Sequence, residues 1–342
     1  MLRTLTFPDS ELETTVLGFG CAHLYGVPRS AERLRLLAAA HDAGIRHFDV
    51  APMYGLGLAE RELGRFIRHR REAVVVATKF GIAPTLFARS LARVQVPVRR
   101  LFLSLPALRE RARSTAAGPA SGRAGALLYD NVGYDAASAK ASLEESLRQL
   151  RTEYVDLLLL HDPLPGDVRS DEVRAYLEDA RRDGRIRAWG VTGELAPSVA
   201  VARALSGPVP VLQLRDDIFL RSLRAVPPAT ASGLIVFGVL GRALKRLVAH
   251  LSADSRRRHR WSAAVGADCS RLDTIASLLF RDALQENSSG VVLFSTIRPE
   301  RVSATVMAAE GGGDAPDPAL ERFRGLVEAE LQDGYEIVEN AG

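Results

Sequence analysis

Four residues with complementary chemistry stand at or just beyond the ends of apolar runs: Asp49, Tyr54, Lys79 and His161. They would supply a carboxylate, a phenol, an ammonium and an imidazole. Each taken alone has an ordinary structural explanation, as a turn residue, a packing side chain or a satisfied core histidine. Lys79 is the most informative, because only three of the 45 basic residues are lysines. If the four side chains meet, each will shift the pKa values of the others, as catalytic groups do.

The elements that would bring these residues together are short apolar runs that alternate with amphipathic segments. The predicted strands cover residues 16–20, 46–50, 74–79, 155–161, 187–191, 210–214, 234–238 and 290–294. Several are apolar on both faces, which is typical of a buried parallel sheet. No GxGxxG motif follows a strand, which disfavours an open Rossmann sheet. We therefore expect an α/β protein with a closed (β/α)8 TIM barrel, whose strands all end at one mouth.

Six amphipathic segments predict helices around this barrel. They cover residues 30–44, 58–69, 137–150, 170–184, 197–207 and 274–287. Gly44, Gly184 and Gly207 are expected to end three of them, and Ser170 with Asp171 to begin another.

Three further segments complete the expected architecture, a single barrel domain over residues 1–342. The first residues alternate polar and apolar side chains around Pro8-Asp9-Ser10, which predicts a hairpin across the barrel floor. Residues 80–131 and 239–268 are too long for ordinary connections and follow strand ends, so we expect two long loops over the mouth. The Gly/Pro/Ala-rich part of the first, within 114–125, predicts a lid. A solvated insertion with no role is the alternative.

Composition excludes several functional classes. Of 342 residues, 47% are apolar and 25% charged, which excludes a disordered chain. No apolar run reaches the roughly 18 residues of a membrane helix, and no apolar signal core opens the chain. The net charge of +4 comes from arginines spread along the sequence, so neither nucleic acid nor membrane is expected as a partner. Two cysteines give no disulfide framework, and we expect a cytoplasmic protein without a metal site.

Longer stretches around the four residues resemble the aldo-keto reductase superfamily. The matching segments are GIRHFDVAPMYGLGLAERELGRFI, VVVATKFG, SLRQLRTEYVDLLLLHDP, GLIVFGVLGRAL and VVLFSTIRPERV, in that order. The resemblance implies a (β/α)8 barrel, a nicotinamide cofactor across its C-terminal mouth, and interconversion of carbonyls and alcohols. It also implies that Asp49, Tyr54, Lys79 and His161 are the catalytic residues.

The chemistry that this resemblance implies explains the four residue types. Hydride transfer to a carbonyl carbon leaves negative charge on the oxygen, which Tyr54 would neutralise by donating a proton. A phenol has a pKa of about 10, so we expect the Lys79 ammonium to make it more acidic. At about 4 Å this charge supplies roughly 4 kcal/mol, enough to lower the pKa by up to about three units. Asp49 would keep Lys79 charged, and His161 would orient the carbonyl oxygen as a neutral ring.

The resemblance also assigns residues that bind the nicotinamide half of the cofactor. Thr192 and Gln213 correspond to ligands of the carboxamide, while Gly193 replaces a common Asn. Phe237 replaces the usual Tyr that stacks on the nicotinamide ring. The segment over the pyrophosphate matches Leu240, Gly241 and Arg242.

Arg298 and Arg301 match positions near the adenosine 2′-phosphate, and Ser295 and Thr296 just before them are also expected to belong to the cofactor site. Ser295 or Thr296 is expected to cap the helix that starts near Pro299. A helix start with two arginines three residues apart favours a phosphate, so NADPH or NADP+ is expected rather than NADH. Two solvated surface arginines are the alternative interpretation. Ala304 and Thr305 replace the Glu and Asn that the family often places against adenine.

We therefore favour an NADP(H)-dependent oxidoreductase that interconverts a small-molecule carbonyl and an alcohol, with Tyr54 as proton donor or acceptor. An aldehyde, a ketone or a sugar would each fit as the substrate, and we expect a monomer or a weak homo-oligomer. A cofactor-binding regulatory or non-catalytic subunit on the same barrel is the alternative function. A Schiff-base lyase that uses Lys79 is a third.

Overall fold

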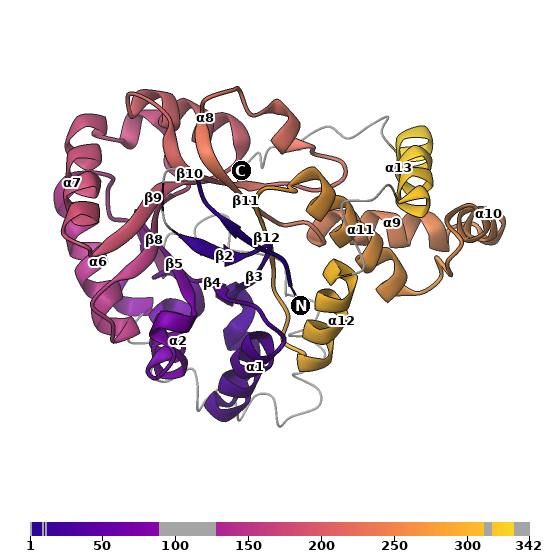
Figure 1. Cartoon of the computed structure of the whole chain (residues 1–342), viewed down its shortest axis with the longest axis horizontal. Coiled ribbons are helices and arrows are strands. Elements are labelled where there is room, and N and C mark those ends of the chain that lie inside the picture. Colours follow the sequence, from indigo (N-terminus) through magenta and orange to yellow (C-terminus); the bar gives the residue numbers. More distant parts are fainter. Residues whose placement is uncertain (1, 9, 11, 89–127, 311–316, 332–342) are drawn as a thin grey trace.

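The chain folds around a closed ring of eight parallel strands (Figure 1). The structure is a computed structural model that describes residues 2–8, 10, 12–88, 128–310 and 317–331. The barrel strands are β3 (Leu17–Gly20), β4 (His47–Asp49), β5 (Val75–Phe80), β8 (Val155–His161), β9 (Ile186–Gly193), β10 (Val209–Arg215), β11 (Ala231–Phe237) and β12 (Val291–Phe294). Each pairs with the next in chain order, and β12 closes the ring against β3. The predicted barrel and its eight strands are confirmed.

Helices pack around the outside of this ring. They are α1 (Ser30–Asp42), α2 (Ala59–Ile67), α6 (Ala136–Leu150), α7 (Ser170–Arg182), α8 (Leu195–Ala204), α9 (Gly241–Ser252), α10 (Ser255–Val265), α11 (Leu272–Glu286), α12 (Pro299–Glu310) and α13 (Pro318–Leu331). The six predicted helices are all present. Gly44, Gly184 and Gly207 follow three of them at positive φ, as expected of helix ends.

A short hairpin closes one end of the barrel. β1 (Thr4–Thr6) and β2 (Glu13–Thr15) pair antiparallel, and in Figure 1 they lie across the centre of the ring. Phe7 and Leu12, between the two strands, are buried among the interior side chains of the barrel. Gly233 of β11 makes room for the Phe7 ring, which would collide with a side chain there. The predicted hairpin across the barrel floor is present.

Residues 239–268 differ from the expected loop, because they contain the helices α9 and α10. That part of the prediction is wrong. Figure 1 shows α9, α10 and α13 extending to one side of the barrel. Trp261 of α10 is buried and donates a hydrogen bond to Glu330 of α13, which also accepts one from Arg260. The arginine-rich run is therefore helical because one face packs on α13, a partner about 70 residues later that local patterning does not reveal.

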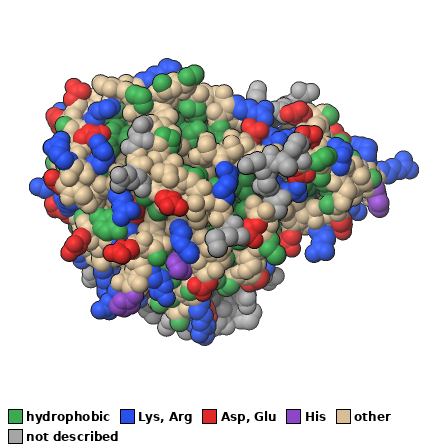
Figure 2. Space-filling view, in the orientation of Figure 1, with side chains coloured by type: hydrophobic (Ala, Val, Ile, Leu, Met, Phe, Trp, Pro, Cys, Tyr) green, Lys and Arg blue, Asp and Glu red, His purple; other side chains and the backbone are tan. Residues whose placement is uncertain are grey.

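The arginines of α10 also mark the surface. On the face seen in Figure 2, acidic and basic side chains are interspersed over the barrel. Basic side chains gather at the edge that α10 forms.

The long connection after β5 is described only at its two ends. β6 (Ile82–Pro84) and β7 (Tyr129–Asn131) form an antiparallel ribbon. A side chain at Gly57 would lie 3.2 Å from Pro84, so the ribbon borders the segment just after Tyr54. Residues 89–127, which include the predicted lid at 114–125, lie outside the described residues.

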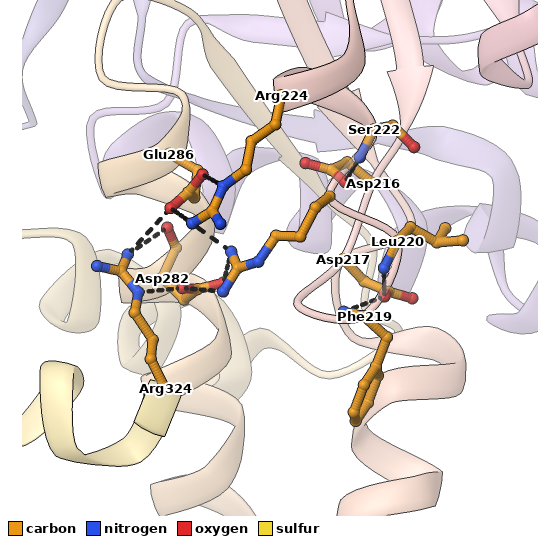
Figure 3. A network of polar contacts seen from close by, with 10 residues as sticks. Asp216, Asp217, Phe219, Leu220, Ser222, Arg224, Asp282, Glu286 and Arg324 are labelled. Carbon is orange, nitrogen blue, oxygen red and sulfur yellow. Dashed lines mark hydrogen bonds and ion pairs between the residues drawn. The ribbon is translucent and has the colours of Figure 1, made fainter. Parts of the chain in front are cut away.

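A network of ion pairs holds the connection after β10 (Figure 3). Arg221 pairs with Asp282 at 2.8 Å, and Arg224 pairs with Glu286 at 2.7 Å. Arg324 of α13 pairs with Asp282 at 2.6 Å. Because Asp282 and Glu286 both belong to α11, these contacts join one loop at the barrel mouth to two outer helices.

Candidate active site

Asp49, Lys79 and His161 lie on three neighbouring strands at the C-terminal end of the barrel. Asp49 ends β4, Lys79 is the penultimate residue of β5 and His161 ends β8, and these strands pair in that order. The Lys79 Nζ donates to Asp49 Oδ1 at 2.7 Å and to the Val50 carbonyl at 3.0 Å. The Lys79 side chain is 2% exposed, so the ammonium and the carboxylate form a buried ion pair.

Tyr54 reaches this ion pair from a tight turn. It begins the 3-10 helix η2 (Tyr54–Gly57), where Gly55 has a φ of 59°, in the left-handed region that favours glycine. The Lys79 Nζ lies 4.9 Å from the centroid of the Tyr54 ring. The His161 ring meets the Tyr54 ring edge to face, with 6.1 Å between their centroids. The structure thus brings the four candidate catalytic side chains into one group.

Burial sets the proton affinity of this group. Burial raises the pKa of Tyr54, and the Lys79 ammonium lowers it only in part. The expectation of a phenol more acidic than usual is wrong for that reason. Burial also opposes the charge on Lys79, but the Asp49 carboxylate, the largest opposing cause, helps to raise the pKa of Lys79 above its ordinary value. The resulting arrangement, a protonated phenol beside a charged ammonium, is the form that donates a proton.

His161 is an uncharged ring. Burial, and secondly the charge of Lys79, lowers the pKa of His161 to about 3. Its Nδ1 is buried and has no hydrogen-bond partner among the described residues, while its Nε2 lies 3.8 Å from Asp162 Oδ2. A carboxylate on that side favours the proton on Nε2. This tautomer donates a hydrogen bond to a carbonyl oxygen, which is the role expected of His161.

Gln213 and Thr192 lie side by side in neighbouring strands. They pair in register between β10 and β9, and Thr192 pairs with His161 on its other side. The Gln213 Nε2 donates to Asp49 Oδ2 at 3.0 Å. The Gln213 Oε1 is buried and accepts no hydrogen bond within the described part of the chain. Gln213 therefore offers an unused acceptor beside the ion pair.

Phe237 ends β11, opposite Arg215 at the end of β10. The Arg215 guanidinium lies 5.1 Å from the centroid of the Phe237 ring, and its Nε donates to Glu194 at 2.6 Å. One face of the predicted stacking ring is thus covered by a cation that an acidic residue holds in place.

The start of α9 lies a few residues after Phe237 in the chain. Leu240 precedes the helix, Gly241 begins it, and a side chain at Gly241 would meet nothing within 4 Å. The charge of Arg242 acts on the carboxylate of Asp217, so Arg242 and the loop after β10 are neighbours. No side chain of the described residues caps this helix start, and a helix start with an arginine beside it suits an anion.

The start of α12 differs from the expectation. The Ser295 hydroxyl donates to the Gly20 carbonyl, and Thr296 Oγ1 accepts from the backbone N–H of Arg298 at 3.1 Å. Arg298 precedes α12, so both hydroxyls hold the turn before the helix, and the predicted helix cap is not formed by either. Arg298 and Arg301 are both exposed.

Comparison with known proteins decides the family. A model of the aldo/keto reductase family matches residues 16–222, more than half of the 342 residues. The chain belongs to the aldo/keto reductase family.

Individual relatives match only part of this chain. The D-threo-aldose 1-dehydrogenase of Pseudomonas sp is 32% identical over 186 residues, which are 53% of this chain and 50% of that protein. The chain spans about half the length of the curated relatives it matches.

Two solved structures show the same fold. A glycerol dehydrogenase from Gluconobacter oxydans superposes with a TM-score of 0.69 at 19% identity, covering 99% of both chains. An aldo-keto reductase from Klebsiella pneumoniae in complex with NADPH gives 0.63 at 19% identity, covering 96% of this chain and 95% of that one.

Two features of the mouth fit the nicotinamide cofactor of an aldo/keto reductase. The unused Gln213 Oε1 would accept a hydrogen bond from a carboxamide N–H. The open start of α9 beside Arg242 would suit a pyrophosphate.

Three mouth residues were missed by the sequence reasoning: Asp162, Glu194 and Arg215. The signal that identifies them is their place at or just after the ends of β8, β9 and β10, where the family motifs contain their neighbours instead.

Within the described ranges, no helix is both long and apolar enough to cross a membrane.

Proposed function

We propose that this protein is an NADP(H)-dependent oxidoreductase that interconverts a carbonyl and an alcohol by hydride transfer, with Tyr54 as proton donor and acceptor. The observation that carries the proposal is the buried Lys79–Asp49 pair at 2.7 Å, with its ammonium 4.9 Å from the centroid of the Tyr54 ring and the neutral His161 ring 6.1 Å from that centroid. This set places a proton donor and an orienting donor around one oxygen atom.

Each residue then has a separate task in carbonyl reduction. The bound nicotinamide would supply the hydride. His161 donates a hydrogen bond from Nε2 to the carbonyl oxygen and fixes its position. Tyr54 passes its hydroxyl proton to that oxygen as the negative charge develops, and Lys79 stabilises the phenolate that remains. Asp49 holds Lys79 in place and offsets the cost of its burial. Alcohol oxidation follows the same steps in reverse.

The cofactor preference in this proposal is for NADPH over NADH. It is supported by Arg298 and Arg301, two exposed arginines three residues apart where α12 begins. A phosphate bound between them would gain charge-assisted hydrogen bonds that a free 2′-hydroxyl lacks.

The small-molecule substrate is an aldehyde, a ketone or a sugar. Relatives named D-threo-aldose 1-dehydrogenase, methylglyoxal reductase and L-galactose dehydrogenase support this range. The two buried, unpaired cysteines support a reducing compartment such as the cytoplasm.

The test is a titration with NADPH and NADH followed by protein fluorescence, and then a panel of aldehydes, ketones, sugars and lactols with both cofactors. Saturable NADPH binding with turnover of at least one class supports the proposal. Tight NADPH binding without any turnover would favour a regulatory or non-catalytic subunit instead. Trapping of a carbonyl on Lys79 by borohydride would favour a lyase.

A further inference from the structure

Asp162 places a carboxylate directly beside the proposed catalytic histidine. It follows His161 in the chain, and its Oδ2 lies 3.8 Å from His161 Nε2. The Asp162 side chain is 56% exposed, while that of His161 is 10% exposed. Asp162 is therefore the more exposed of the two side chains, beside the nitrogen that would hold the carbonyl oxygen.

The backbone holds this carboxylate in place. The N–H of Asp162 donates to the Thr192 carbonyl at 2.8 Å, so the pairing of β8 and β9 continues to this residue. Asp162 has a φ of 49°, a left-handed conformation that Asp tolerates better than most residues. A side chain at Gly193 would lie 2.7 Å from Asp162 Oδ1. Gly193, which replaces a common Asn of the family, thus leaves the space that the carboxylate occupies.

The oxygens of Asp162 are free to accept hydrogen bonds. Among the described residues, no group donates a hydrogen bond to this carboxylate, and the cations that act on it, Lys79 and Arg215, do so from a distance. The neighbouring acid, Glu194, is already paired with Arg215 at 2.6 Å. Asp162 is therefore an acceptor at the mouth that no hydrogen-bond donor of the described residues occupies.

We propose that Asp162 determines substrate specificity by accepting a hydrogen bond from the hydroxyl on the carbon next to the reacting carbonyl. The substrate class is then 2-hydroxy aldehydes and ketones, together with the sugars that contain this unit. This inference rests on the proposed function. His161 Nε2 and Asp162 Oδ2 belong to adjacent residues at the end of β8 and lie 3.8 Å apart. A substrate whose carbonyl oxygen accepts from Nε2 can therefore place a hydroxyl on the next carbon within reach of Asp162.

The same carboxylate disfavours substrates that lack this hydroxyl. Reduction develops negative charge on the carbonyl oxygen, and a second, unpaired negative charge nearby opposes it. A hydroxyl between the two removes that conflict by donating to Asp162. A site built to bond a hydroxyl rejects the analogue without it more strongly than a hydrophobic pocket rejects a missing methylene.

The experiment compares two aldehydes that differ by one hydroxyl, lactaldehyde (2-hydroxypropanal) and propanal, with NADPH. We expect kcat/KM to favour lactaldehyde by at least about tenfold, since a hydrogen bond to a charged group is involved. In Asp162→Gly, which keeps the left-handed backbone without strain, this preference should fall to about twofold or less. In Asp162→Asn, which keeps an acceptor and loses the charge, it should be intermediate.

The matched control is Glu194→Gln, which removes a carboxylate from the same mouth and leaves Asp162 in place. It should keep the preference of the parent. An unchanged preference in Asp162→Gly would overturn the proposal, and so would an equal loss in Glu194→Gln, which would indicate a general field effect.

A binding measurement separates this proposal from the proposed function. Calorimetry with NADP+ present compares 1,2-propanediol with 1-propanol, and Asp162→Gly should weaken only the diol. A parent that turns over no carbonyl contradicts the proposed function, while the diol comparison still tests Asp162. Equal binding of both alcohols by the parent would count against the role of Asp162 whatever the turnover.

Discussion

Burial opposes the charge on Lys79, but the Asp49 carboxylate, which accepts from the Lys79 Nζ, raises the pKa of Lys79 above its ordinary value. Tyr54 shows the opposite balance, since burial raises the pKa of its hydroxyl despite that ammonium. At the scale of single residues, the site therefore keeps its phenol protonated and its lysine charged. The consequence is a proton donor whose neutral form gains little from Lys79, whereas the phenolate formed during the reaction is stabilised by its charge.

Replacement of Tyr54 by Phe removes the hydroxyl and keeps the ring that packs against His161. Turnover should fall by at least about 10²-fold, as expected when a general acid is lost. The dissociation constant for NADPH, measured by fluorescence titration, should stay nearly unchanged. A variant that keeps more than half of the activity would remove Tyr54 from the mechanism.

Replacement of Arg301 by Ala should raise the dissociation constant for NADPH at least tenfold, because a charge-assisted hydrogen bond to the 2′-phosphate is lost. The constant for NADH should change by no more than about twofold, since NADH has no such phosphate. Fluorescence titration with both cofactors measures this. Arg256→Ala, at an exposed position on the first turn of α10, is the control and should change neither constant. Equal weakening of both cofactors by Arg301→Ala would show that Arg301 is structural.

The four candidate catalytic residues could be found from the sequence because each lies at or near the end of an apolar run, and a barrel brings such ends together. Asp162, Glu194 and Arg215 also lie at strand ends, but their roles depend on which way each side chain leaves its strand, and the sequence does not give that direction. The cap predicted for α12 is wrong for a similar reason. Ser295 donates to Gly20 of β3, and Thr296 accepts from Arg298 in the turn before the helix.

At the scale of elements, the connection after β10 depends on two buried aspartates. Asp216 accepts from the backbone N–H of Ser222, and Asp217 accepts from those of Phe219 and Leu220 (Figure 3). Such contacts between side chain and backbone shape a loop that the outer ion pairs of α11 and α13 then hold. The helices of residues 239–268 likewise depend on contacts with α13 that only the folded chain supplies.

Asp216 should make the protein less stable as pH rises. Burial raises the pKa of Asp216 from 3.8 to about 6 in the folded protein. Between about pH 4 and pH 6 the unfolded chain has lost this proton and the folded protein retains it, so the free energy of unfolding falls through that window. The cost above pH 6 is about 2–3 kcal/mol, from about 1.36 kcal/mol per pKa unit.

Asp216→Asn removes this cost and keeps an oxygen that accepts from Ser222. The variant should be more stable than the parent at pH 7.5, in ~50 mM salt, and no more stable near pH 4. Urea unfolding at both pH values measures the difference. Asp254→Asn should show the opposite sign at pH 7.5, because backbone N–H groups of Arg256 and Arg257 hold the pKa of Asp254 below its usual value. A parent and an Asp216→Asn variant of equal stability at both pH values would contradict the prediction.

At the scale of the whole molecule, the barrel is a filled core with different contents at its two ends. Side chains of the hairpin, with the apolar interior of the strands, fill the floor. The polar groups that would do chemistry occupy the mouth, above that layer. The barrel and its floor were predictable because period and strand length are local properties, whereas the lateral extension by α9, α10 and α13 depends on contacts between distant segments.

This separation predicts that the floor governs stability without governing chemistry. Leu12 is 1% exposed in the floor, and Leu164 is 56% exposed beyond β8. Leu12→Ala should lower the free energy of unfolding by about 2–5 kcal/mol, because it removes buried methyl groups and leaves a cavity. Leu164→Ala, the same chemical change at an exposed position, should cost no more than about 0.5 kcal/mol. Urea unfolding at an unchanged m-value measures both. Below the unfolding transition, kcat/KM of Leu12→Ala should remain within about twofold of the parent, since the floor touches neither the Lys79–Asp49 pair nor Tyr54. A large loss of kcat/KM with little loss of stability would contradict this prediction. It would mean that the packing of the hairpin in the barrel interior positions the residues at the strand ends.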